Sequence, residues 1–338
     1  MPHVSPAGWV AYVGAMPIAS PKTWDSLKRR MPVRPISTGK FITATPRDLF
    51  LFERLNWHGP LPSPYLIEYS RHFGHRSIGR ARDRLTDLGH EQNTAHGGRY
   101  LDKPAAQYPQ LPGGYVPRNH TNVYALNDVS KKALAEAGRL VENTHAGWWD
   151  HQLMLSCVTA SLELATLADP SLGFIPRHQA IGDRRLSAVV PFTHEGRSHS
   201  LKLIPDQLFG IRYGDKKLYF LLEVDRSTEL VSHGSFERKS FLRSFLQYRQ
   251  FVGGQLYKKH YGMEEGMVVL FLTTTERQMQ SMIDFVMCVT EGRGNNYVLF
   301  KSAHEFGGRG TVSSPPLLDL LLTPWKRAGM ADLALRSL

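Results

Sequence analysis

The stretch of residues 201–228 constrains the fold of this 338-residue chain more than any other. It reads LKLIPDQLFGIRYGDKKLYFLLEVDRST, with two strand-like runs on either side of a polar turn at residues 214–217. The second run, residues 218–224, is almost wholly apolar. A short apolar run bounded by turn residues is typical of a strand buried on both faces. The stretch therefore predicts an antiparallel hairpin inside a buried sheet.

Three carboxylates fall within this hairpin. Side chains alternate along a strand, so Glu223 and Asp225 point to the same side, roughly 7 Å apart. The hairpin would bring Asp206 close to them, and three convergent carboxylates suit a hard cation such as Mg²⁺ or Mn²⁺. The residues alone leave a second interpretation open, in which these carboxylates are solvated caps or ion-pair partners and Arg226 neutralises one of them.

The charge of the chain indicates a polyanionic partner. Lys and Arg outnumber Asp and Glu by enough to give a formal charge of +11 and a pI near 9.6. A surplus of this size favours nucleic acid, and less often a membrane surface. Two isolated cysteines give neither a disulfide framework nor a zinc spacing. The sequence has no apolar run of membrane-spanning length and no signal peptide, so we expect a cytoplasmic protein without a membrane partner.

The first half of the chain predicts a helix-turn-helix. Thr45-Pro46 and Ser63-Pro64 are both typical helix starts, and residues 77–88 form a third expected helix. On that helix one side is apolar, and the other side carries the basic residues Arg76, Arg80 and Arg84, with Arg82 among them. Two short helices, a turn and an Arg-bearing third helix are the pattern of a DNA-binding helix-turn-helix.

Strand-like pieces at residues 99–101 and 122–126 would add a wing to this domain. A winged helix of this kind would bind double-stranded DNA, with the third helix in the major groove. The alternative is a protein-docking module. The segment before it, residues 1–42, is expected to be a basic, poorly ordered arm, and the winged helix itself would span residues 43–143.

The second half alternates helices and strands, which predicts an α/β (α+β) domain with a mixed sheet. A helix at residues 148–167 precedes several strands, and the expected order is then helix, strand, helix, strand. We place this domain at residues 144–325 and a C-terminal tail at 326–338. One long helix is expected at residues 235–261, with Phe241, Phe245 and Tyr248 on its apolar stripe.

Two motifs in the hairpin resemble known families. The string Glu223-Val224-Asp225-Arg226-Ser227-Thr228 is similar to the Glu-x-Asp-Arg-Gly-Thr signature of the replication-relaxation family. The Pro205-Asp206 pair and the hairpin after it resemble the core of the PD-(D/E)XK nucleases. The resemblance spans about residues 45–325. It implies a winged helix joined to a nuclease-like domain, in a protein of a bacterial plasmid or integrative element.

The resemblance also implies roles for particular residues. Asp206 and Glu223 would be catalytic and would hold Mg²⁺ or Mn²⁺. In these nucleases a Lys two residues after the Glu helps to orient or deprotonate water. Asp225 stands at that position here, as it does in the replication-relaxation signature, and would act as a third metal ligand.

The cation missing from that position would have to come from elsewhere in the chain. Lys239 on the following helix is our first candidate for it, and Lys202 is the second. Related nuclease cores also place a metal-facing carboxylate on the helix before the sheet, and Glu163 matches that position.

These observations give three hypotheses for function. The first is a DNA-binding protein of a mobile element that acts in plasmid replication, DNA relaxation or mobilisation. The second is a metal-dependent endonuclease that nicks or cleaves DNA. The third is a non-catalytic transcriptional regulator or scaffold with an inactive nuclease fold. Double-stranded DNA is the expected partner, and the sequence leaves open a homodimer or a complex with replication or relaxosome proteins.

Overall fold

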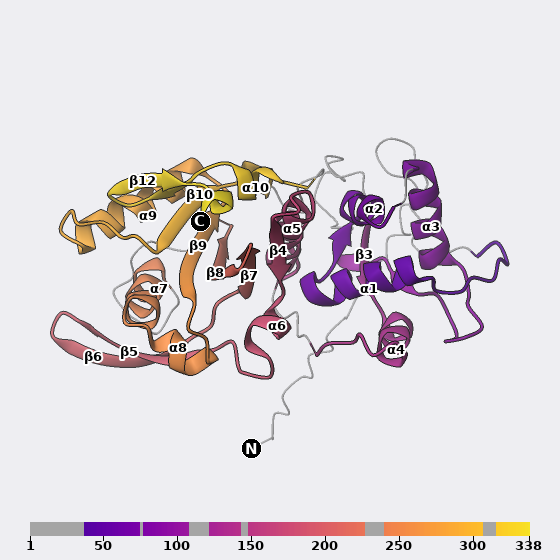
Figure 1. Cartoon of the computed structure of the whole chain (residues 1–338), viewed down its shortest axis with the longest axis horizontal. Coiled ribbons are helices and arrows are strands. Elements are labelled where there is room, and N and C mark those ends of the chain that lie inside the picture. Colours follow the sequence, from indigo (N-terminus) through magenta and orange to yellow (C-terminus); the bar gives the residue numbers. More distant parts are fainter. Residues whose placement is uncertain (1–36, 75–76, 108–121, 143–147, 227–239, 307–315) are drawn as a thin grey trace, which may run out of the picture.

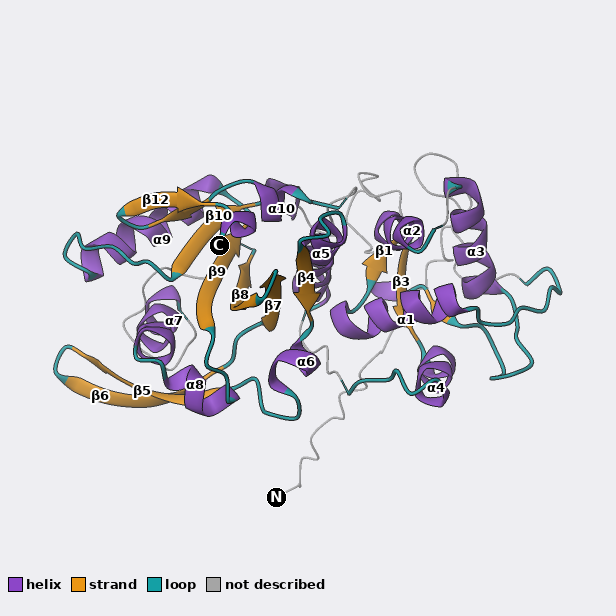
Figure 2. Cartoon of the chain, viewed as in Figure 1, coloured by secondary structure: helices purple, strands orange, loops and turns teal. Residues whose placement is uncertain are grey.

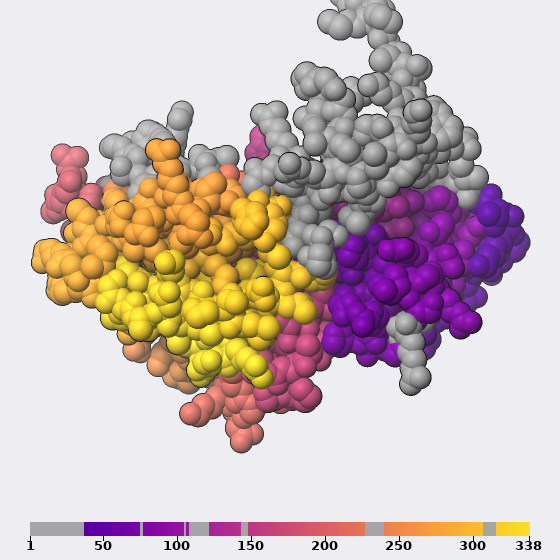
Figure 3. Space-filling view, turned by 90° about the horizontal axis from the view of Figure 1, so that it is seen from above, coloured from indigo at the N-terminus to yellow at the C-terminus, as the bar shows by residue number. Residues whose placement is uncertain are grey.

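A computed structural model describes residues 37–74, 77–107, 122–142, 148–226, 240–306 and 316–338. The chain folds into two lobes, with helices α1–α4 at one end of the molecule and a large sheet at the other (Figure 1). The space-filling view shows the indigo and purple N-terminal lobe against the orange and yellow C-terminal lobe (Figure 3). Among the described residues, no helix is both long and apolar enough to cross a membrane.

The N-terminal lobe combines four helices with a small antiparallel sheet. Its strands lie in the order β1-β3-β2, so the first strand of the lobe pairs with the last. The elements are α1 (Pro46–His58), β1 (Leu61–Pro62), α2 (Ser63–His72), α3 (Ile78–His90), β2 (Leu101–Asp102), η1 (Ala105–Gln107), β3 (Val123–Leu126) and α4 (Asp128–Glu136).

Local capping explains where these helices begin. The Thr45 side chain accepts a hydrogen bond from the Asp48 amide, while the Asp48 carboxylate accepts one from the Thr45 amide, and Pro46 occupies the first turn. Gly59 ends α1 at a φ of 101°, which favours glycine. Ser77 caps α3 in the same way as Thr45 caps α1. The predicted starts of α1 and α3 are thus confirmed.

The C-terminal lobe is built on a seven-stranded mixed sheet of order β12-β11-β10-β9-β8-β7-β4. Strands β8, β9 and β10 are parallel, and the outer pairs are antiparallel. The expected mixed α/β fold is therefore confirmed. The elements are α5 (Trp149–Leu167), β4 (Leu172–Ile175), α6 (Arg177–Ile181), β5 (Ala188–His194), β6 (Arg197–Leu203), β7 (Gln207–Tyr213), β8 (Lys216–Asp225), α7 (Phe241–Tyr248), η2 (Arg249–Gly253), α8 (Leu256–Tyr261), β9 (Gly266–Thr273), α9 (Glu276–Val289), β10 (Val298–Ser302), η3 (His304–Phe306), α10 (Asp319–Leu322), β11 (Trp325–Arg327), β12 (Met330–Leu333) and η4 (Leu335–Ser337).

Helices cover both faces of this sheet, as Figure 2 shows. On β8, Phe220 and Leu222 join the core cluster that includes α5 and the N-terminal lobe. Tyr219 and Leu221 point the other way, into the cluster formed with α7, α8 and α9. Burial on both faces explains why this strand reads as a continuous apolar run.

One expectation about a helix needs correction. The helix expected at residues 235–261 is wrong in its described part, because α7 ends at Tyr248 and passes through one π turn, η2. The chain then restarts as α8 after Gln255, which has a φ of 58°. The sheet also extends beyond residue 325, since β12 pairs with β11.

Candidate functional site

The predicted carboxylates lie at the hairpin of β7 and β8. Glu223 and Asp225 are both in β8, with only 3 % and 6 % of their surface exposed. Asp206 immediately precedes β7, and the pairing of Gln207 with Leu222 brings it next to Glu223 across the hairpin. The structure therefore places Asp206 and Glu223 side by side, as the hairpin predicted.

Asp206 is oriented by the backbone of β8 and by helix α5. Its Oδ2 accepts a hydrogen bond of 2.8 Å from the Val224 amide. The same oxygen lies 3.2 Å from Nε2 of His151, in the first turn of α5. One residue earlier on α5, Asp150 forms an ion pair of 2.9 Å with Arg226 at the end of β8. The start of α5 is thus fixed to the same strand ends as the carboxylates.

Glu223 is oriented by helix α7. The Tyr248 hydroxyl donates a hydrogen bond to Oε1 of Glu223 inside the protein. Burial raises the pKa of Tyr248 well above its usual value, and the charges of Glu223 and Asp206 raise it further. Tyr248 therefore stays protonated and remains a donor.

Asp225 is held from the neighbouring strand and helix. It pairs with Thr273 on the parallel strand β9, and its Oδ2 accepts a hydrogen bond of 3.3 Å from Nε2 of Gln278 on α9. These residues lie at the carboxyl ends of β8 and β9. In open α/β sheets, ligands commonly bind at this edge.

The carboxylates fit a metal ion only in part. Within the described ranges, no group of three His, Cys, Asp or Glu side chains is gathered in a way that could hold a metal ion. The adjacent pair Asp206 and Glu223 fits another mode, since Mg²⁺ usually keeps several waters and binds one or two carboxylates together with substrate phosphates. The pair therefore fits a cation completed by a phosphate, and a preformed cage of three carboxylates does not fit.

Of the two lysine candidates for the missing cation, the structure describes one, Lys202. Lys239 lies outside the described residues. Lys202 is exposed on β6, and its carbonyl accepts a hydrogen bond of 3.0 Å from Nη2 of Arg243 on α7.

The basic residues of the third helix have different surroundings. Arg80 and Arg82 are exposed on α3, whereas Arg76 lies outside the described residues. Arg84 is partly buried, and its Nη2 lies 2.6 Å from Oδ2 of Asp48. Burial lowers the pKa of Arg84, but hydrogen bonding to Asp48 and that residue's charge raise it overall. Arg84 thus links α3 to the start of α1.

Next to these arginines is an open hollow of ≈ 470 Å³. It lies between the start of α1, the end of α2 and the outer side of α3. Its lining includes the basic residues Arg47, Arg80 and Arg84, the acidic residues Asp83 and Asp87, and the half-exposed ring of Phe73.

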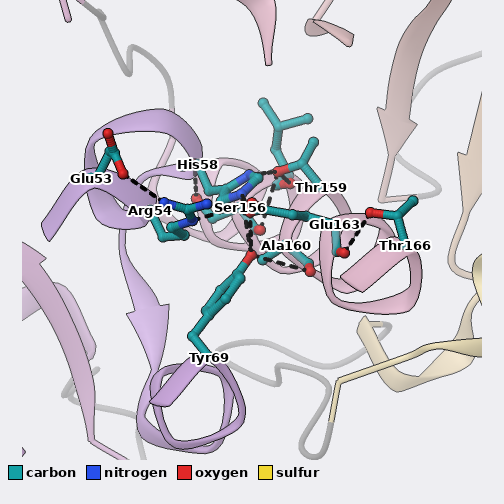
Figure 4. A network of polar contacts seen from close by, with 10 residues as sticks. Glu53, Arg54, His58, Tyr69, Ser156, Thr159, Ala160, Glu163 and Thr166 are labelled. Atoms are coloured by element: carbon teal, nitrogen blue, oxygen red, sulfur yellow. Dashed lines mark hydrogen bonds and ion pairs between the residues drawn. The ribbon is translucent and has the colours of Figure 1, made fainter. Parts of the chain in front are cut away.

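Glu163 faces the N-terminal lobe (Figure 4). It is 2 % exposed, and its Oε2 lies 2.6 Å from Nε2 of His58 and accepts a hydrogen bond of 2.7 Å from Tyr69. Its other oxygen lies 3.2 Å from Nε of Arg54. Burial would raise the pKa of Glu163, but these partners outweigh burial and lower it. Glu163 therefore joins the two lobes. The side chains that bind it come from α1 and α2 and not from the hairpin that carries the carboxylate pair.

Comparison with known proteins identifies the family. A model described as replication-relaxation matches residues 52–266, well over half of the chain. The chain belongs to the replication-relaxation family. Membership in this family indicates a role in the replication or relaxation of a plasmid or other mobile element. No curated protein and no solved structure gave a match.

The replication-relaxation match begins within α1 and ends at the first residue of β9, so it includes both α3 and the carboxylate pair. Sequence reasoning did not place His151 and Tyr248 at this pair, nor Gln278 beside Asp225. Tyr248 belongs to the apolar stripe that the sequence predicts on its helix, and its ring packs in the core. A tyrosine in an otherwise apolar stripe is a signal that its hydroxyl has a buried partner.

Proposed function

We propose that this protein binds double-stranded DNA of a mobile element through a winged helix-turn-helix in its N-terminal lobe. The order of elements supports this assignment: α1, β1, α2 and α3 are followed by the antiparallel strands β2 and β3, which close a sheet with β1. In this arrangement α3 takes the place of the recognition helix, and β2 and β3 take the place of the strands of the wing.

The position of α3 is the observation that carries the proposal. It lies at the end of the molecule remote from the large sheet (Figure 1). Ala81, Leu85 and Leu88 pack it into the lobe, which leaves Arg80 and Arg82 on its exposed side. A protein with a charge of +11 and an exposed basic helix meets the electrostatic requirement for binding DNA.

Measuring duplex affinity at several salt concentrations tests this proposal. Replacing Arg80 and Arg82 together with Ala should weaken binding and reduce the salt slope by about two, because each lost phosphate contact removes about 0.9 from it. The matched control removes two exposed charges from the other lobe, Lys216→Ala with Arg293→Ala, and should leave the slope nearly unchanged. An unaltered affinity and slope in the α3 variant, with its circular dichroism intact, would overturn the assignment.

A second candidate function is metal-dependent cleavage of the bound DNA. The adjacency of Asp206 and Glu223, at the edge of the sheet where β7 begins and β8 ends, favours it. Mg²⁺ or Mn²⁺, when bound, would polarise a phosphodiester and acidify a water molecule. The chain itself would hold both carboxylates in place, through His151 and the Val224 amide for Asp206 and through Tyr248 for Glu223.

Nicking of supercoiled plasmid with Mg²⁺ or Mn²⁺ tests this second function. We expect nicking by the wild type and its loss in Asp206→Asn and Glu223→Gln, with duplex affinity retained. Lys239→Ala should also lose nicking if Lys239 supplies the missing cation. Duplex binding without nicking on several DNA substrates would support the third hypothesis, a non-catalytic regulator or scaffold.

A further inference from the structure

The side chain of Trp148 is 89 % exposed at the start of α5. It is the most exposed large hydrophobic side chain among the described residues. Exposed apolar side chains are common singly, but tryptophan is large, and its full exposure at a fixed position favours a binding role.

The backbone of Trp148 is anchored. Its carbonyl accepts a hydrogen bond of 3.0 Å from the Gln152 amide, which places it at the N-cap of a 19-residue helix. The next residue, Trp149, is partly buried and packs against the large core. One tryptophan therefore holds the start of α5 in place, while the indole of its neighbour projects from it.

Trp148 is connected to the carboxylate pair through the first turn of α5. It is separated by a single helical turn from His151, whose Nε2 is 3.2 Å from Asp206. Between them, Asp150 pairs with Arg226. The start of α5 thus carries the exposed indole, the aspartate that pairs with Arg226 and the histidine that contacts Asp206.

We propose that Trp148 is a stacking platform for an unpaired base of a nucleic acid strand entering the carboxylate site. Aromatic side chains beside basic groups bind single strands in this way, because every base has a flat face and every linkage a negative phosphate. This inference rests on the proposed function, since it assumes that the site receives DNA. It adds that the strand at the site is unpaired, although α3 binds the duplex.

The test measures affinity for a mixed-sequence single-stranded oligonucleotide of about 15 nucleotides, without metal, by fluorescence anisotropy. A single OB-fold site takes about 4–16 nucleotides, so this length suffices. Trp148→Ala should weaken binding about 5- to 150-fold, the range of one lost base stack. Trp148→Phe should restore most of it, and the affinity of Trp148→Ala for a blunt duplex should match that of the wild type. The matched control is Phe41→Ala, an exposed aromatic of the other lobe, 72 % exposed.

Failure of this inference can be distinguished from failure of the proposed function. If Trp148→Ala binds the single strand as the wild type does, or if the wild type does not bind it, stacking is overturned. Stacking is also overturned if sedimentation shows that Trp148→Ala dissociates a protein dimer while the affinity for the oligonucleotide is unchanged. The duplex affinity of the variant with Arg80 and Arg82 replaced tests independently whether the winged helix binds DNA.

Discussion

Two buried glutamates of the same domain make a useful comparison. Glu163 and Glu223 are 2 % and 3 % exposed, and each accepts a hydrogen bond from a buried tyrosine, Tyr69 or Tyr248. The two glutamates differ in the charge of their other neighbours. Glu163 is also bound by Arg54 and His58 across the junction of the lobes, whereas Glu223 lies beside a second carboxylate, Asp206.

This difference assigns the two glutamates to different tasks. A buried carboxylate surrounded by a guanidinium, an imidazole and a hydroxyl stabilises the fold, because removing it takes one partner away from each of these buried groups. Two carboxylates brought together across the antiparallel hairpin of β7 and β8, at the edge of the sheet where β8 ends, suit a cation or a phosphate-bearing ligand instead. Both glutamates are buried and have a tyrosine partner, so these two features alone do not distinguish a structural carboxylate from one in a ligand-binding site.

The largest expected effect is on stability at the junction. Glu163→Ala leaves the buried His58 without its carboxylate and Arg54 with Glu53 as its remaining one, which should cost about 3–5 kcal/mol of unfolding free energy. Urea denaturation followed by circular dichroism would measure it. The conservative variant Glu163→Gln should lose less, since it can still accept a hydrogen bond from Tyr69. A loss below about 1 kcal/mol in Glu163→Ala would show that the junction does not hold the lobes together.

The tyrosine hydroxyls offer a matched pair of smaller changes. Tyr69→Phe and Tyr248→Phe each remove one donor from a buried carboxylate, so each should lower stability by about 1–3 kcal/mol. Only Tyr248→Phe should alter metal-dependent nicking, because Tyr248 orients Glu223. The comparison would fail if Tyr69→Phe changed nicking as strongly while keeping duplex affinity.

The pH dependence of the junction is a finer test. The pKa of Glu163 is lowered in the folded protein, so its contribution to stability is present above the unfolded value, about 4.3. That contribution is lost as the pH falls through the folded pKa. The stability difference between wild type and Glu163→Gln should therefore be largest above about pH 5 and shrink in more acidic solution. A difference that stays constant from pH 6 down to pH 3 would contradict the lowered pKa.

Much of the fold could be predicted from local sequence. The caps Thr45 and Ser77 mark α1 and α3, and the apolar run before Glu223 marks the buried strand, because these signals depend on neighbouring residues only. The break of the long helix at η2 was missed, although Gly253-Gly254 is visible in the sequence. The short strand pair β11 and β12 was also missed, since it is defined by pairing with β10.

The only part of the candidate site that could be predicted from the sequence is the part formed by a single hairpin. Asp206 and Glu223 come together because the turn between their strands sets the register. His151, Tyr248 and Gln278 reach the site from three different helices, and no local pattern encodes such contacts. Glu163 was misjudged for the same reason, since its partners lie on α1 and α2, about a hundred residues earlier in the chain.

The central claim is that Glu223 belongs to a ligand-binding site, whereas Glu163 stabilises the fold. The Mn²⁺ affinity of matched glutamine variants tests this claim most directly. Isothermal titration calorimetry would compare wild type, Glu223→Gln and Glu163→Gln, each verified as folded. We predict that Glu163→Gln binds Mn²⁺ as the wild type does, and that Glu223→Gln binds it at least about tenfold more weakly, a loss of about 1.4 kcal/mol. Equal affinity in Glu223→Gln and wild type, or no binding by the wild type, would contradict the account.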